Sequence, residues 1–119
     1  MGEAIPPALQ EEIARIQQIQ QTLQAVSLQR QQLELELMGI ERAVSELERL
    51  TDDAVVYKSV GSILIRSTRQ LLLQELKERK ELLNTRVATL TRQEERARER
   101  LKDSQQRLQE KLKLSNLAP

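Results

Sequence analysis

The sequence of 119 residues contains no cysteine and no histidine. Their absence excludes disulfide bonds, thiolate chemistry, zinc sites built from Cys and His, and imidazole acid–base catalysis. We therefore expect no metal and no cofactor. The Asp, Glu, Lys and Ser side chains that remain lie on regular exposed faces, with no pocket to shift their pKa values, so we do not expect an enzyme.

Aromatic residues and long apolar runs are also scarce. Tyr57 is the single aromatic residue, and no segment approaches the roughly 20 apolar residues of a membrane span. The N-terminus lacks the features of a signal peptide, so we expect a soluble, cytoplasmic protein without a membrane partner. Nineteen basic and eighteen acidic residues leave a net charge of +1, which gives no electrostatic reason to expect a nucleic-acid partner.

Glycine and proline are rare, with three of each. Apart from Gly39 and the two ends of the chain, they are missing from everything before Asp52 and after Thr68. Charged residues make up 31% of the sequence, and Leu, Glu, Gln and Arg dominate it. This composition is typical of long helices or coiled coils.

A first helix is expected over residues 8–51, with Pro7 able to occupy its first turn. Positions alternately three and four residues apart form a seam in which ten of thirteen members are apolar. Such a heptad pattern, sustained over many repeats, favours a coiled coil. The members of this first seam are Leu9, Glu12, Ile16, Ile19, Leu23, Val26, Arg30, Leu33, Leu37, Ile40, Val44, Leu47 and Thr51.

A second helix is expected over residues 68–113, with Thr68 or alternatively Ser67 as its N-cap. Its seam is weaker, with eight of thirteen members apolar. The members of this second seam are Arg69, Leu73, Leu76, Lys80, Leu83, Val87, Leu90, Glu94, Ala97, Leu101, Ser104, Leu108 and Lys111.

The two seams superimpose when the chain is folded back at residue 60. Leu47 then faces Leu73, Leu37 faces Leu83, and Leu23 faces Ala97. The seam positions of two unrelated amphipathic helices would not pair symmetrically about the turn. An antiparallel coiled coil requires this pairing, because its seam side chains must meet at matching heights along the two helices. We therefore predict a mainly α-helical fold: one domain (1–119) in which two long helices form an intramolecular antiparallel coiled coil.

The segment between the helices, 54–66, differs from the rest of the chain because it is rich in β-branched residues. Two short apolar runs separated by a few residues that include a glycine predict a β-hairpin, with Gly61 supplying a positive φ at the turn. A lone hairpin is not stable in water, and its edges can pair with another chain. We interpret it as an assembly element rather than a capped loop, formed by Val55, Val56, Tyr57, Val60, Gly61, Ile63, Leu64 and Ile65.

The opposite ends of the two helices are also apolar. Ile13, Leu114 and Leu117 fall off the seam, so the facing helix cannot bury every apolar residue there. Two interpretations remain open: an ordinary coiled-coil end with stray leucines, or a surface that binds apolar segments of other chains. The residues concerned are Ile5, Leu9, Ile13, Ile16, Leu108, Leu112, Leu114 and Leu117.

The hairpin segment matches a family pattern. Residues 52–66 fit Asp-x-x-Val-Tyr-Lys-x-x-Gly-x-Ile-Leu-Ile, and segments 31–34 and 92–96 add support. The chain thereby resembles the β-type subunits of prefoldin, the archaeal and eukaryotic co-chaperone. A single hairpin marks the β-type, because α-type subunits carry two.

The resemblance implies a hexamer of two α-type and four β-type subunits, so further copies of this chain are expected partners. The hairpins would join into an intersubunit β-barrel with Val55 to Ile65 of this chain contributing. The helix ends would hold unfolded polypeptides and deliver them to a group II chaperonin without ATP hydrolysis by prefoldin. The alternative is a coiled-coil tether or scaffold that binds no client.

Overall fold

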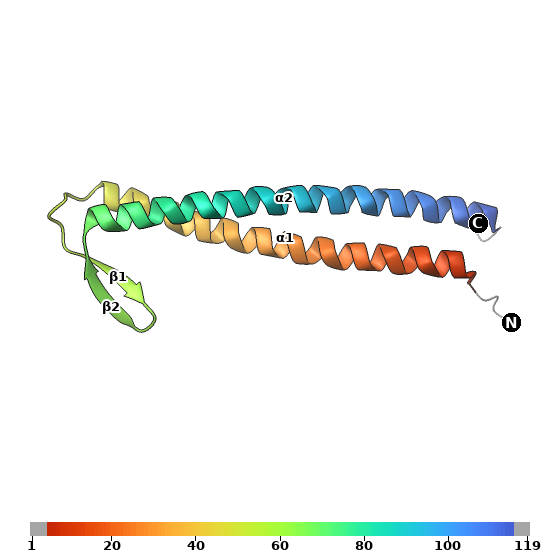
Figure 1. The fold of residues 1–119 in the computed structure, drawn as a ribbon, viewed down its shortest axis with the longest axis horizontal. Coiled ribbons are helices and arrows are strands. Elements are labelled where there is room, and N and C mark those ends of the chain that lie inside the picture. The colour runs from red at the N-terminus through yellow and green to blue at the C-terminus, as the bar shows by residue number, and fades with distance from the viewer. Residues whose placement is uncertain (1–4, 116–119) are drawn as a thin grey trace. The chain divides into compact units, whose positions relative to one another are not determined.

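The computed structural model describes residues 5–115 of the chain. Two long helices, α1 (Pro7–Glu48) and α2 (Arg69–Leu114), are joined by an antiparallel hairpin of β1 (Val56–Val60) and β2 (Ile63–Ser67), as Figure 1 shows. The predicted fold class, two long helices with a two-stranded hairpin between them, is confirmed.

The chain divides into two compact units. The hairpin unit comprises residues 30–88, and therefore holds both strands, the second part of α1 and the first part of α2. The end unit comprises residues 1–29 and 89–119, of which 5–29 and 89–115 are described. It brings the first turns of α1 beside the last turns of α2.

Helix α1 begins at Pro7, where the missing N–H costs nothing, and the Pro6 carbonyl accepts hydrogen bonds from the amides of Leu9 and Gln10 at 3.0 and 3.1 Å. The helix ends at Glu48, three residues before the predicted boundary at Thr51. The next two amides bond to carbonyls only three residues back, which tightens the last turn and stops the helix.

The start of α2 is fixed by two side chains. The Thr68 hydroxyl accepts a hydrogen bond from the Leu71 amide at 3.2 Å, as expected for the N-cap. Arg69 reaches back to the end of α1, where its Nε donates to the Leu47 carbonyl at 2.7 Å, and it forms a 2.8 Å ion pair with Asp52. Because the last carbonyls of a helix lack partners within it, Arg69 acts as a cap for α1.

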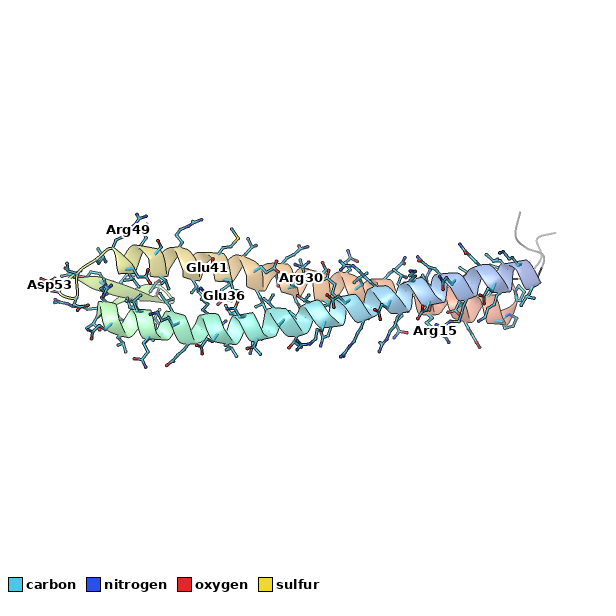
Figure 2. The ribbon with its side chains drawn as sticks, turned by 90° about the horizontal axis from the view of Figure 1, so that it is seen from above. Arg15, Arg30, Glu36, Glu41, Arg49 and Asp53 are labelled. Atoms are coloured by element: carbon cyan, nitrogen blue, oxygen red, sulfur yellow. The ribbon has the colours of Figure 1, made fainter. Side chains whose placement is uncertain are left out.

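The core of the hairpin unit is apolar. Leu37, Ile40 and Leu83 are buried, and four half-buried residues pack against them: Leu33, Val44, Leu76 and Val87. The cluster contains three of the facing pairs that the mirrored seams predict. Ion pairs of Arg79 with Glu36 (2.9 Å) and Lys80 with Glu41 (3.8 Å) flank it, and both acids lie on the side of α1 that faces α2 (Figure 2).

Burial follows the predicted seams in both units. All members of the second seam are buried or half-buried, and so are all members of the first except Thr51, which lies beyond the end of α1. The heptad interpretation is thus confirmed residue by residue. Within residues 5–115, neither helix contains a stretch long and apolar enough to cross a membrane.

Candidate functional site

The hairpin is closed by a two-residue turn. Val60 pairs with Ile63, leaving Gly61 and Ser62 as the loop, and Gly61 has the predicted positive φ, at 59°. Two-residue loops need left-handed backbone that glycine adopts without steric cost. This turn sets the strand register, in which Tyr57 pairs with Arg66 and Lys58 with Ile65.

One end of the hairpin is anchored on the helices of the same unit. Val56 is buried, at 8% exposure, and lines a shared groove with Leu47, Leu72 and Leu76. Next to it, the Lys58 ammonium donates to the Glu75 carboxylate at 2.8 Å. Val56 therefore packs the hairpin onto its own helices.

The other apolar side chains of the hairpin remain in solvent. Their exposed fractions range from 44% for Val60 to 70% for Leu64, and the other members are Val55, Tyr57, Ile63 and Ile65. Because successive side chains of a strand alternate between faces, both faces of the hairpin carry them. In the described part of the chain, no third strand covers either edge. These features suit a surface that pairs with another chain.

The apolar residues assigned to the helix ends differ in exposure. Ile5 and Leu114 are exposed, at 48% and 85%, whereas Leu9 is buried at 2% because it occupies a seam position. Four are half-buried: Ile13, Ile16, Leu108 and Leu112. Leu117 lies outside the described residues. The exposed apolar surface of the described helix ends is thus provided by the two outermost residues, with the half-buried ones behind them.

A buried charge lies one turn inside Leu9. The side chain of Glu12 is fully buried and bonds to Lys111 at 3.1 Å, Arg15 at 3.1 Å and Arg107 at 3.5 Å. Burial acts to raise its pKa. The hydrogen bond and charge of Lys111, the charge of Arg15 and a hydrogen bond with Ser104 outweigh burial, so the pKa of Glu12 is held below its usual value. The carboxylate therefore stays ionised at neutral pH and ties the two helix ends together.

A groove lies between the two helices of the end unit, with a volume of about 480 Å³. It exists because Ala97 and Ser104 are small residues at seam positions, so they leave space that a leucine would fill. Ile19 contributes an apolar wall, while Arg15, Arg100 and Arg107 contribute charge. The sequence analysis singled out neither this groove nor Glu12. The available signal was the polar or small residues Glu12, Ala97 and Ser104 at seam positions near the chain ends.

These features define an antiparallel coiled-coil protein with an interhelical β-hairpin. A family profile described as prefoldin subunit matches residues 10–114, which is most of the chain, and the chain belongs to the prefoldin family. Prefoldin subunits are co-chaperone subunits that form hetero-oligomers with one another.

Individual relatives agree. The chain is 47% identical over 109 residues to prefoldin subunit beta of Archaeoglobus fulgidus, covering 92% of this chain and 93% of that protein. It is 52% identical over 97 residues to prefoldin subunit beta of Pyrobaculum arsenaticum, covering 82% and 78%. The crystal structure of the prefoldin beta subunit from Thermococcus strain KS-1 superimposes with a TM-score of 0.83 at 40% identity, covering 93% of this chain and 97% of that one.

Proposed function

We propose that this chain is the β-type subunit of a prefoldin hexamer that binds unfolded polypeptides and delivers them to a group II chaperonin without ATP hydrolysis. Two α-type subunits and further copies of this chain, four in total, would complete the complex. The observation that carries the proposal is the hairpin, whose six exposed apolar side chains and two open edges have no use in an isolated chain. Family membership supplies the chaperone context.

Assembly through the hairpin would proceed by strand pairing. Side chains such as Ile63, Leu64 and Ile65, exposed between 47% and 70%, would be buried between subunits of a β-barrel. Burying a side chain of this size contributes about 1.5–3 kcal/mol, so several per subunit offset the cost of association. Val56 and the Lys58–Glu75 ion pair hold the hairpin on its own helices while the exposed residues meet the partner.

Client binding would use the helix ends. Ile5 and Leu114 offer apolar surface directly, and Ile13, Ile16, Leu108 and Leu112 offer more when the last turns fray. We include Leu9 and Leu117 in this surface as the sequence analysis assigned them, with Leu9 reached only after the helix ends separate. Each end would bind weakly, and several ends in one complex would bind together through effective concentration.

Assembly is tested with Val55→Asp and Ile65→Asp, measured by native mass spectrometry of the chain alone and mixed with an α-type subunit. A charge buried at a subunit interface is costly, so both variants should lose the large complex while keeping their helical circular dichroism. Leu35→Asp is the matched control, because Leu35 is an apolar residue on α1 that is more exposed (67%) than Val55 (58%) or Ile65 (47%), and it should leave the complex intact. Persistence of the full complex in Ile65→Asp contradicts the proposal.

Client binding is tested by deleting the apolar ends, residues 1–13 and 108–119. A complex that acts as a chaperone should keep its subunit composition and stop suppressing the aggregation of a denatured test protein. A structural tether keeps its subunit composition and has no suppressing activity to lose. Full suppression by the shortened complex contradicts the assignment of the helix ends.

A further inference from the structure

The groove of the end unit differs from the rest of the chain in its charge. The chain as a whole carries 19 basic and 18 acidic residues, but among the described residues no Asp or Glu lines the groove. Its charged lining consists of Arg15 from α1 and of Arg100 and Arg107 from α2, with Gln18 and Thr22 as neutral polar neighbours. A groove with cations alone on its rim favours a ligand that carries negative charge.

Two of the arginines are held in place by the protein itself. Arg15 and Arg107 both bond to the buried carboxylate of Glu12, and Arg107 also donates to the hydroxyl of Ser104 at 3.5 Å. Their side chains are nevertheless 51% and 52% exposed. Each guanidinium has five N–H donors in a rigid fork, so the contact with Glu12 leaves donors that point to solvent.

Arg100 is different because it forms no hydrogen bond or ion pair within residues 5–115. It lines the groove from the α2 side and is exposed. Arg100 therefore has all of its N–H donors available. Arg15 and Arg107, which are held by Glu12, add further donors to the groove. A carboxylate can accept two parallel hydrogen bonds from one guanidinium, which makes it the matching group.

The apolar lining of the groove adds a second requirement for the ligand. Ile19 and Ala97 are apolar, and they lie where the small seam residues leave room. Sites of about 480 Å³ accommodate a few side chains rather than a folded surface. The fitting ligand is therefore an extended polypeptide segment in which an apolar side chain stands next to Asp or Glu.

We infer that this groove is a second client-binding site, selective for unfolded segments that combine apolar and acidic residues. The inference rests on the proposed client-binding function and names a substrate class for it. Binding at the apolar helix ends depends little on salt, because it comes from buried apolar area. Binding in the groove adds an electrostatic part that salt weakens, since its charges are half-exposed.

The test uses the complete complex and fluorescent unstructured peptides of equal length and equal apolar content, whose polar positions are all Glu or all Gln. The Glu peptide should bind more tightly than the Gln peptide, and its advantage should shrink as salt is added. Arg100→Gln should weaken the Glu peptide by about threefold and leave the Gln peptide unchanged. Arg96→Gln is the matched control: Arg96 is exposed on the same helix, does not line the groove, and should change the binding of neither peptide.

A second pair of variants adds charge instead of removing it. Thr22→Glu places a carboxylate on the rim, where it competes with the ligand, and should abolish the preference for the Glu peptide. Gln21→Glu makes the same charge change at an exposed neighbour outside the lining and should preserve it. Neither site is buried, so folding is not at risk.

Equal binding of the Glu and Gln peptides would contradict the proposed groove site. The same holds if Arg100→Gln acts like Arg96→Gln and Thr22→Glu acts like Gln21→Glu. In that outcome the complex still suppresses the aggregation of a denatured protein, so the proposed chaperone function stands. A complex that suppresses no aggregation at all contradicts the proposed function itself. The two failures are therefore distinguishable.

Discussion

The hairpin unit and the end unit hold their helices together with different side chains. In the hairpin unit, Leu37, Ile40 and Leu83 form a buried apolar cluster. In the end unit, buried positions also include Glu12, Glu94 and Ser104. An apolar cluster gains stability from burial alone, whereas a buried charge first has to recover its desolvation cost through partners. The hairpin unit is therefore stabilised mainly by apolar burial, whereas the end unit also depends on specific polar and charged contacts.

The largest expected effect is on the apolar cluster. Leu83→Ala removes a side chain with no exposed surface and should lower the free energy of unfolding by about 2–5 kcal/mol, measured by urea denaturation followed by circular dichroism. Leu82→Ala, at an exposed neighbour (45%), should cost far less. Ser104→Ala, at a fully buried site of the end unit, should also have a small effect. Equal losses for Leu83→Ala and Ser104→Ala would remove the contrast between the units.

The cap that Arg69 forms on α1 comes next. Arg69→Met keeps the aliphatic part of the side chain but loses the hydrogen bond to the Leu47 carbonyl and the ion pair with Asp52. A lost hydrogen bond from a charged donor costs about 1.5–3 kcal/mol, and hydrogen exchange should locate the loss at residues 45–52. Arg66→Met is the control, because the Arg66 side chain is exposed and forms no hydrogen bond or ion pair within residues 5–115. Unchanged exchange at the end of α1 contradicts the capping role.

A smaller effect, confined to the end unit, is expected from Glu12 and acid. Since the folded-state pKa of Glu12 is lowered, its ionised form contributes stability in full above the unfolded value of about 4.3, and this is lost as the pH falls through the folded value. The protection factors of amides at residues 8–16 and 104–112, which correct the exchange rate for its intrinsic pH dependence, should therefore fall in acid, and less so in Glu12→Gln. Asp53→Asn is the control, because its lowered pKa comes from the Thr51 hydroxyl in the loop after α1. A wild-type acid response retained in Glu12→Gln would show that other groups cause it.

The smallest effect concerns the exposed Lys58–Glu75 pair, whose side chains are 47% and 38% exposed. Exposed ion pairs contribute at most about 1 kcal/mol, so Lys58→Gln should barely change unfolding. Its influence should appear instead as faster hydrogen exchange in the hairpin, with Lys77→Gln as the control. A large loss of global stability would mean that the hairpin and helices depend on each other more than the contacts indicate.

Much of the fold could be predicted because its signals are local. The heptad spacing, the scarcity of Gly and Pro, and the glycine between two apolar runs located both helices and the hairpin, and burial along the seams follows the prediction. The end of α1 was placed three residues late, since its cap is Arg69, a residue about twenty positions further along. The sequence pattern around the end of α1 does not reveal a capping residue that lies so far along the chain.

The site was predicted less completely. The exposed apolar hairpin follows from composition, but the burial of Val56 depends on how the hairpin packs against Leu47 and Leu76. Likewise, the mirrored seams place Glu12 opposite Leu108, but they do not tell which cations reach its carboxylate. The contacts with Lys111 and Arg107 depend on side-chain conformation. The groove between the helices of the end unit likewise depends on side-chain conformation, which the sequence pattern does not specify.

The mirrored pairing of the seams restricts how such a chain can change in length during evolution or engineering. Removing one heptad from α1 alone would leave an unmatched heptad on α2, and every layer beyond the cut would meet the wrong neighbour. Matched insertions or deletions of whole heptads in both helices keep each layer intact and change the length of each helix by about 10 Å at a time. The length of the helices is therefore adjustable in steps of one heptad, and each change has to be made in both helices.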